Sequence, residues 1–188
     1  NGSGSVAEPG GTVNARIDNA TWGLRELGDI TLDARVDGAQ AFIDAKNDRY
    51  SLTANAQVGV AAPYPATMTA TIDGLDLSML PVQMPVPLAG TLRARMTGSG
   101  DVTNARAGSA SVTIEAFEGS LNDQPIALPE PAQLTYQDQR LQIESLQVSA
   151  SGSTLAVSGD LPLEPSATAG SIAVNADLDL WSLPLYLP

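Results

Sequence analysis

The 188-residue chain contains no cysteine, no histidine and a single lysine, Lys46. The lack of cysteine excludes disulfides and thiol chemistry, and the lack of histidine removes the commonest general base and metal ligand. Nucleic-acid binding needs clustered basic residues, whereas the nine basic residues here are scattered and the net charge is −12. We therefore expect no nucleic-acid partner, no cofactor and no enzymatic activity.

Long apolar runs are also missing, and aromatic residues make up only 4% of the chain. Because no run reaches the ~18 apolar residues that a membrane-spanning helix needs, no such helix is predicted. Hydrophobic residues nevertheless reach 43%, which is enough for a folded domain. We expect residues 1–5 to be a linker or a cloning remnant, and residues 6–188 to be a single module of a longer repeat protein.

The dominant pattern is an alternation of apolar and polar residues, which is typical of strands with one buried face. Residues 13–17 alternate in this way, and similar segments follow at short intervals. The apolar phase changes between Ile143 and Leu146, which predicts a β-bulge near Ser145. Residues 98–101, Gly-Ser-Gly-Asp, are predicted to form a turn.

Part of this pattern occurs twice, at a constant offset of 103 residues. Leu75-Asp76-Leu77 reappears as Leu178-Asp179-Leu180, and Leu80-Pro81 reappears as Leu183-Pro184. Weaker matches continue upstream of both copies. Each copy therefore reads as strand, hairpin, strand, proline-rich crossing and strand, ending in a leucine-rich corner.

Roughly a dozen such strands would form a sheet that is aliphatic on one face and polar on the other. The aliphatic face must be covered by barrel closure, by a second sheet, or by folding over as a trough. Many inward residues are alanines, which leave open space in a curved sheet. We predict an all-β fold, a long, curled, mostly antiparallel sheet folded as a trough (a β-groove) with a hydrophobic concave face.

No motif predicts catalysis or metal binding. The carboxylates of Asp73, Asp76, Asp177 and Asp179 raise the question of acid–base chemistry or a cation site. They alternate with leucines, however, and a calcium loop needs a denser run of ligands. We interpret them as a solvated face. A serine nucleophile would need a base, and Lys46 beside a predicted turn is a poor candidate.

Several segments carry a resemblance to a known family. They are Gly90-Thr91-Leu92-Arg93-Ala94 with Gly98-x-Gly100, the segment from Ile126-Ala127-Leu128 to Leu134, Leu141 to Val148, Leu155-x-Val157-x-Gly159-x-Leu161, and the Asp-Leu-Asp-Leu corner. Through these segments most of residues 30–188 resembles the AsmA-like superfamily and, within it, the translocation and assembly module (TamB) family.

The resemblance implies a Gram-negative protein that is anchored in the inner membrane and has a long periplasmic body. Such a protein would carry phospholipid between the inner and outer membranes and assist outer-membrane protein assembly. For the full-length protein, the resemblance also implies an Omp85-type (TamA-like) outer-membrane barrel as partner. The region that would dock this barrel is not identifiable in the chain.

Alternation and resemblance together predict a groove for phospholipid or another acyl-chain ligand, lined by fourteen apolar residues. These are Ile30, Leu32, Val36, Leu52, Met68, Ile72, Leu92, Met96, Val112, Ile114, Leu155, Val157, Ile172 and Val174. Two alternatives stay open. One is a chaperone groove that accepts strands of outer-membrane proteins, and the other is a closed structural or adhesin β-domain without a ligand.

Overall fold

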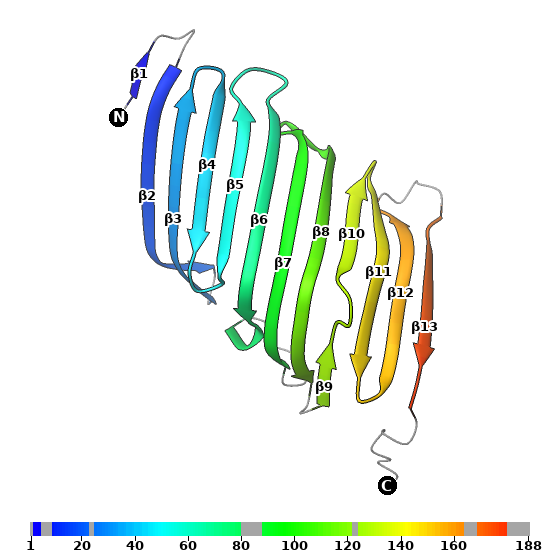
Figure 1. Cartoon of the computed structure of the whole chain (residues 1–188). Helices are drawn as coiled ribbons and strands as arrows, with labels where there is room; N and C mark the ends of the chain where they lie inside the picture. Colours follow the sequence, from blue (N-terminus) through cyan, green and yellow to red (C-terminus); the bar gives the residue numbers. More distant parts are fainter. Residues whose placement is uncertain are drawn as a thin grey trace.

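The computed structural model describes residues 2–4, 9–22, 25–79, 88–121, 124–163 and 169–179. In this part of the chain, thirteen strands form one antiparallel sheet (Figure 1). The strands are β1 (Gly2–Gly4), β2 (Pro9–Trp22), β3 (Arg25–Asp37), β4 (Gln40–Asn47), β5 (Leu52–Gly59), β6 (Pro65–Asp76), β7 (Leu88–Asp101), β8 (Asn104–Leu121), β9 (Gln124–Ala127), β10 (Ala132–Gln137), β11 (Arg140–Ala150), β12 (Ser153–Pro162) and β13 (Ser171–Asp177). A short 3₁₀ helix, η1 (Leu77–Met79), follows β6. The predicted all-β class is confirmed.

Strand order follows chain order, with one local irregularity. Strands β9 and β10 share the gap between β8 and β11, and each pairs with both neighbours. They therefore act together as one interrupted strand (Figure 1). At the other end of the sheet, Gly2–Gly4, which we expected to be part of a linker, form β1 and pair with β2.

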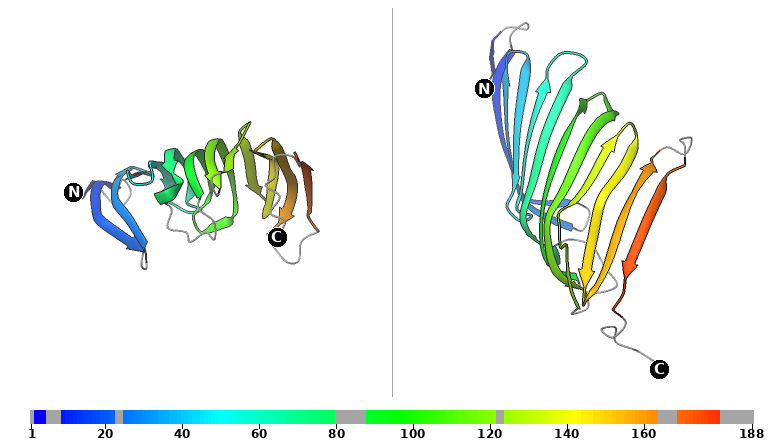
Figure 2. Two further views of the ribbon diagram at one scale, coloured as in Figure 1. Left: turned by 90° about the horizontal axis from the view of Figure 1, so that it is seen from below. Right: turned by 45° about the vertical axis from the view of Figure 1, so that its right-hand side comes forward.

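The sheet is a single layer that curls along its length, as the view from below in Figure 2 shows. Its accessible surface is 12811 Å², about 1.5 times the roughly 8,500 Å² expected for a compact protein of 19.4 kDa. Among the described residues, the buried apolar side chains are Leu75, Leu77 and Ala132. The predicted open trough is confirmed, because the described strands neither close into a barrel nor pack on a second sheet.

Burial alternates with the same period as hydrophobicity along β5 and β7, in the middle of the sheet. In β5, Leu52, Ala54 and Ala56 are half-buried, whereas Thr53 and Asn55 are exposed. The same alternation runs along the described part of β7. Side chains inside a curved sheet shield one another, while those outside splay apart, because successive residues point to opposite faces. The apolar residues therefore line the concave face.

Two β-bulges keep apolar residues on this face where the sequence changes phase. The register of β11 against β12 shifts between Ile143 and Leu146, which confirms the bulge predicted near Ser145. A second shift precedes Leu75 in β6, at Gly74, whose φ is +79°. Glycine adopts this left-handed conformation without steric cost, so the bulge turns Leu75 back to the apolar side.

The turn predicted at residues 98–101 is wrong. These residues form the end of β7 and pair with both β6 and β8, and the turn follows at Val102 and Thr103. The physical reason is close strand approach. A Cβ atom on Gly100 would lie 2.8 Å from the Cα atom of Gly108 on β8. The glycines therefore allow tight pairing instead of reversing the chain.

The 103-residue offset also relates strands of the fold. Shifted by this offset, β4, β5 and β6 largely coincide with β11, β12 and β13. Residues 80, 81 and 180–184 of the two leucine corners lie outside the described residues. Leu75 is 4% exposed, whereas the matching Leu178 is 56% exposed. Two features distinguish the copies: the Gly74 bulge precedes only Leu75, and β7 flanks β6, while no described strand flanks the outer edge of β13.

Candidate functional site

The concave face carries an uninterrupted apolar row across eleven strands. Its members are cross-strand partners, so the register places them on one face, which we call the apolar face. They are Ala15, Leu32, Ala45, Ala54, Ala70, Met96, Val112, Leu134, Ile143, Gly159 and Ile172. With strands about 4.8 Å apart, the row is roughly 48 Å long. It contains no charged residue.

The register places all fourteen predicted lining residues on the apolar face. Leu32, Met96, Val112 and Ile172 belong to the row itself. The other ten lie in neighbouring rows and are Ile30, Val36, Leu52, Met68, Ile72, Leu92, Ile114, Leu155, Val157 and Val174. The most exposed of the fourteen are Val174 at 60% and Ile172 at 50%. Their contact with lipid stays a prediction.

The apolar face deepens into a hollow of about 300 Å³ over β5–β8 and β10, which we call the apolar hollow. It is lined by Ala56, Ala66, Thr67, Met68, Met96, Gly98, Ser99, Gly100, Asp101, Val102, Ala105, Gly108, Ser109, Ala110 and Tyr136. Nearly all of its lining surface is apolar. A hydrocarbon segment fits such a lining, because it makes no demand for hydrogen bonds.

Glycine and tyrosine shape the apolar hollow. A Cβ atom on Gly98 would lie 3.2 Å from the Cγ atom of Met68, so the missing side chain makes room for the methionine. The hydroxyl of Tyr136 donates to the carbonyl oxygen of Arg106 at 2.7 Å. With its polar tip satisfied in this way, Tyr136 presents its ring to the hollow.

The corner after β6 holds two of the three buried apolar side chains among the described residues. Leu75 and Leu77 are 4% and 8% exposed, and Leu75 is the cross-strand partner of Leu92. Asp76 stays exposed, and its Oδ1 accepts a hydrogen bond from the Ser78 N–H at 2.9 Å. Hydrogen bonds from the side chain and backbone of Ser78 lower the pKa of Asp76. We interpret Asp76 as a capping group for η1.

The other carboxylates that the sequence singled out also have the environment of a solvated face. Asp73, Asp177 and Asp179 are exposed, and Asp73 forms an ion pair with Arg93 at 3.1 Å. Within the described ranges, no group of three or more acidic, histidine or cysteine side chains could hold a metal ion. No helix there is long and apolar enough to cross a membrane.

One polar side chain, Asn47, is buried on the apolar face at 6% exposure, between Ile30 and Leu52 in the register. Its Nδ2 donates to the Leu27 carbonyl oxygen at 2.8 Å, and its Oδ1 accepts from the Tyr50 N–H at 3.0 Å. Since both ends of the amide are satisfied, its burial leaves no unpaired polar group. Asn47 thus holds the turn after β4 at the margin of the apolar face.

The opposite face, which we call the polar face, carries the ion pairs between strands. Nε of Arg95 lies 3.6 Å from Oε1 of Glu115. Arg140 forms a bidentate ion pair with Asp160, in which Nε donates to Oδ1 at 2.9 Å and Nη2 donates to Oδ2. The hydrogen bond from Arg140 lowers the pKa of Asp160, and the same bond raises the pKa of Arg140. Charge is therefore concentrated on the side of the sheet that faces away from the trough.

Sequence reasoning identified the apolar face but missed the apolar hollow. Gly98, Ala110 and Tyr136 were not among the predicted lining residues, although they share a cross-strand row with Met68. A usable signal was present, since Gly98 is in phase with Met96 on the apolar side of the alternation. A glycine at an apolar-side position of a strand leaves space where a side chain would otherwise lie, and this indicates a hollow.

No family model, curated protein or solved structure matches the chain. Membership of the TamB family therefore stays a prediction from the sequence resemblance. The function has to be argued from the apolar face and its surroundings.

Proposed function

We propose that the chain is a module of a periplasm-spanning envelope-biogenesis protein. In this proposal the apolar face conducts or shields phospholipid acyl chains between the inner and outer membranes. The observation that carries the proposal is an aliphatic row about 48 Å long that no second layer covers among the described residues. Proteins rarely expose a large contiguous apolar patch that they do not use for binding.

The physical chemistry of the face suits an acyl chain that moves. Each CH₂ group that leaves water contributes about 0.8 kcal/mol, so a chain gains free energy in proportion to its length. Successive strands offer similar aliphatic side chains, so sliding changes the buried area little and meets low barriers. The row has no charged residue that would trap a headgroup. The apolar hollow would be a resting point for one chain.

The cellular setting is proposed from the sequence resemblance alone. By this resemblance, the full-length protein would lie in the periplasm of a Gram-negative bacterium, with an anchor in the inner membrane. Its partner in outer-membrane protein assembly would be an Omp85-type (TamA-like) barrel. The apolar face is compatible with this setting, because a hydrocarbon chain needs shelter between two membranes.

The test is a pair of adjacent substitutions that add the same charge to opposite faces. We expect Met96→Asp to lower the phospholipid that co-purifies with the chain by about tenfold or more, because a carboxylate in the apolar hollow opposes hydrocarbon. Thr97→Asp, on the exposed polar face, should leave the lipid content unchanged. Mass spectrometry of extracted lipid measures both.

A third variant separates blocked binding from a damaged fold. Ala110→Leu fills the apolar hollow without adding charge, and it should lower lipid content while the thermal unfolding midpoint stays close to that of the unaltered chain. Equal lipid content in all three variants and the unaltered chain would overturn the proposal.

One observation favours the chaperone alternative. All seven residues of β13 are exposed, and no described strand pairs with its outer edge. Such an edge accepts extended peptides by adding a strand to the sheet. Crosslinks from β13 to unfolded outer-membrane protein, with no lipid bound to the apolar face, would favour this function over acyl-chain transport.

A further inference from the structure

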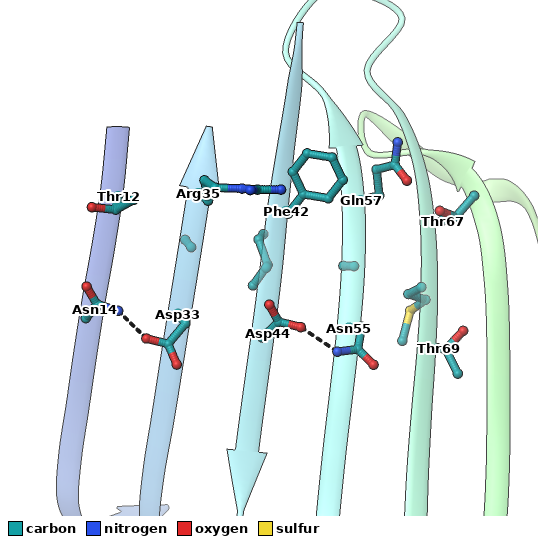
Figure 3. Close-up of a pocket in the computed structure, with 14 residues that line it drawn as sticks. Thr12, Asn14, Asp33, Arg35, Phe42, Asp44, Asn55, Gln57, Thr67 and Thr69 are labelled. Carbon is teal, nitrogen blue, oxygen red and sulfur yellow. Dashed lines mark hydrogen bonds between the residues drawn. The ribbon is translucent and has the colours of Figure 1, made fainter. Parts of the chain in front are cut away.

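The polar face has a hollow of its own, of about 570 Å³, over β2–β6 (Figure 3). Two rows of cross-strand partners border it, and we call these ten residues the polar hollow. One row is Thr12, Arg35, Phe42, Gln57 and Thr67, and the other is Asn14, Asp33, Asp44, Asn55 and Thr69. Ala34, Ile43, Ala56 and Met68 complete the lining between the rows. The ten side chains of the polar hollow alternate with these four along the strands, so they point away from the acyl-chain trough.

In the second row, two amides bracket two carboxylates. Nδ2 of Asn14 donates to Asp33, and Nδ2 of Asn55 donates to Asp44 (Figure 3). Asp33 and Asp44 are direct cross-strand partners, an arrangement of like charges that destabilises a sheet. Each carboxylate has further acceptor capacity, and each amide has a second N–H and an acceptor oxygen. The row therefore offers donors and acceptors side by side to a ligand.

The first row contains an aromatic side chain, Phe42, on the polar face. Phe42 falls where the alternation calls for a polar residue, and its ring is half-buried. The guanidinium of Arg35 lies 4.9 Å from the ring centroid. Among the described residues Arg35 has no ion pair, so its N–H groups keep their donor capacity. Gln57, the cross-strand partner of Phe42 on β5, adds an amide.

We propose that the polar hollow binds an extended, neutral oligosaccharide. Vicinal hydroxyl groups donate and accept at once, which matches a row of amides and carboxylates. The C–H face of a sugar ring packs on an aromatic ring such as Phe42. The rows cross five strands and are roughly 19 Å long, with about 7 Å between them. A chain of several sugars fits this elongated, shallow shape.

Other occupants fit less well. Asp33 and Asp44 outnumber Arg35, which disfavours an anion. A bare cation would need amide oxygens beside the carboxylates, but Asn14 and Asn55 direct their N–H groups there. An extended peptide is recognised mainly through strand edges, and the polar hollow lies in the interior of the sheet.

An NMR titration of the full chain with cellotetraose and chitotetraose tests the proposal. We expect shifts at the side-chain amides of Asn14, Asn55 and Gln57 and at the ring of Phe42. If these resonances shift with both sugars, the polar hollow recognises hydroxyl groups. If they shift with chitotetraose alone, it recognises acetamido groups. No response to either sugar would overturn the proposal, as would a response of the same resonances only to Ca²⁺ or to a lysine-rich peptide.

Matched variants locate the site. Phe42→Ala and the nearly isosteric Asp44→Asn should each weaken sugar binding about tenfold. Thr53→Ala, exposed on the polar face but outside the polar hollow, should not change it. Equal affinity in all variants would overturn the assignment. The lipid content of Phe42→Ala should match that of the unaltered chain, so failure of this proposal is distinguishable from failure of acyl-chain binding.

Discussion

Replacement of Leu75 by alanine tests whether the corner after β6 anchors an otherwise open sheet. Leu75 is 4% exposed, lies opposite Leu92 and is close in sequence to the buried Leu77. A buried leucine truncated to alanine typically costs about 2–5 kcal/mol, depending on how far the surroundings collapse. A single-layer sheet can relax into the space from one side. We therefore expect the free energy of unfolding to fall by about 2–3 kcal/mol.

Leu178 is a matched control for Leu75. It occupies the equivalent place in the second copy of the motif, 103 residues later, but is 56% exposed. Exposed substitutions away from special features usually change stability by less than about 0.5 kcal/mol. Leu178→Ala removes the same atoms in front of the same Asp-Leu pair, so the comparison contrasts a buried leucine with an exposed one.

Urea unfolding, followed by circular dichroism, measures both variants. With an m-value of about 2 kcal/mol/M, Leu75→Ala should lower the midpoint by about 1–1.5 M at constant m. Leu178→Ala should lower it by no more than about 0.3 M. Equal shifts, or a larger shift for Leu178→Ala, would refute the argument that the neighbouring strand β7 makes the first corner the anchor.

Two further predictions concern charge and strand approach. The hydrogen bond from Arg140 lowers the pKa of Asp160 in the folded state below its ordinary value of 3.8. The ion pair therefore stabilises the fold fully above about pH 3.8, and this stabilisation is lost as the pH falls through the folded-state pKa. Asp160→Asn should therefore destabilise the chain at neutral pH and flatten the decline of the urea midpoint below about pH 4; an unchanged decline would contradict this. Gly108→Ala places a Cβ atom 2.7 Å from the carbonyl oxygen of Ser99 and should lower the melting temperature by about 5 °C or more. Gly38→Ala, with nothing within 4 Å, should show only the smaller cost of its φ of +57°, and equal losses would contradict the packing argument.

Local sequence was sufficient for the class of fold and for the faces of its strands. Alternation fixes which residues share a face, and a change of phase must appear as a bulge if one face is to stay apolar. The bulge near Ser145 was predictable for this reason. The same logic put all fourteen predicted residues on the apolar face, because each assignment needed only the residue's own strand.

Features that depend on the partner strand were not predictable from local sequence. Gly98 and Gly100 have the local chemistry of a turn, and only their neighbours on the flanking strands, Met68 for Gly98 and Gly108 for Gly100, explain why they lie in a strand. Leu75 and Leu178 are both followed by Asp-Leu but differ in burial, because only Leu75 follows a glycine bulge and has a described strand beyond it. The polar hollow likewise depends on register, since its two rows come from five strands.

A single-layer sheet resembles a repeat array in its energetics. Contacts between described elements run between neighbours in the sheet and between η1 and β7, so stability is close to a sum of strand-to-strand terms. Such a sheet does not need a sealed core, and its apolar face can stay open to a ligand. A ligand that binds only the folded state stabilises it by RT ln(1 + [L]/Kd), so acyl-chain occupancy should raise the melting temperature with lipid concentration. On the proposed function, the cargo replaces the missing second layer wherever it rests, and the contacts between neighbouring strands remain after the cargo moves on.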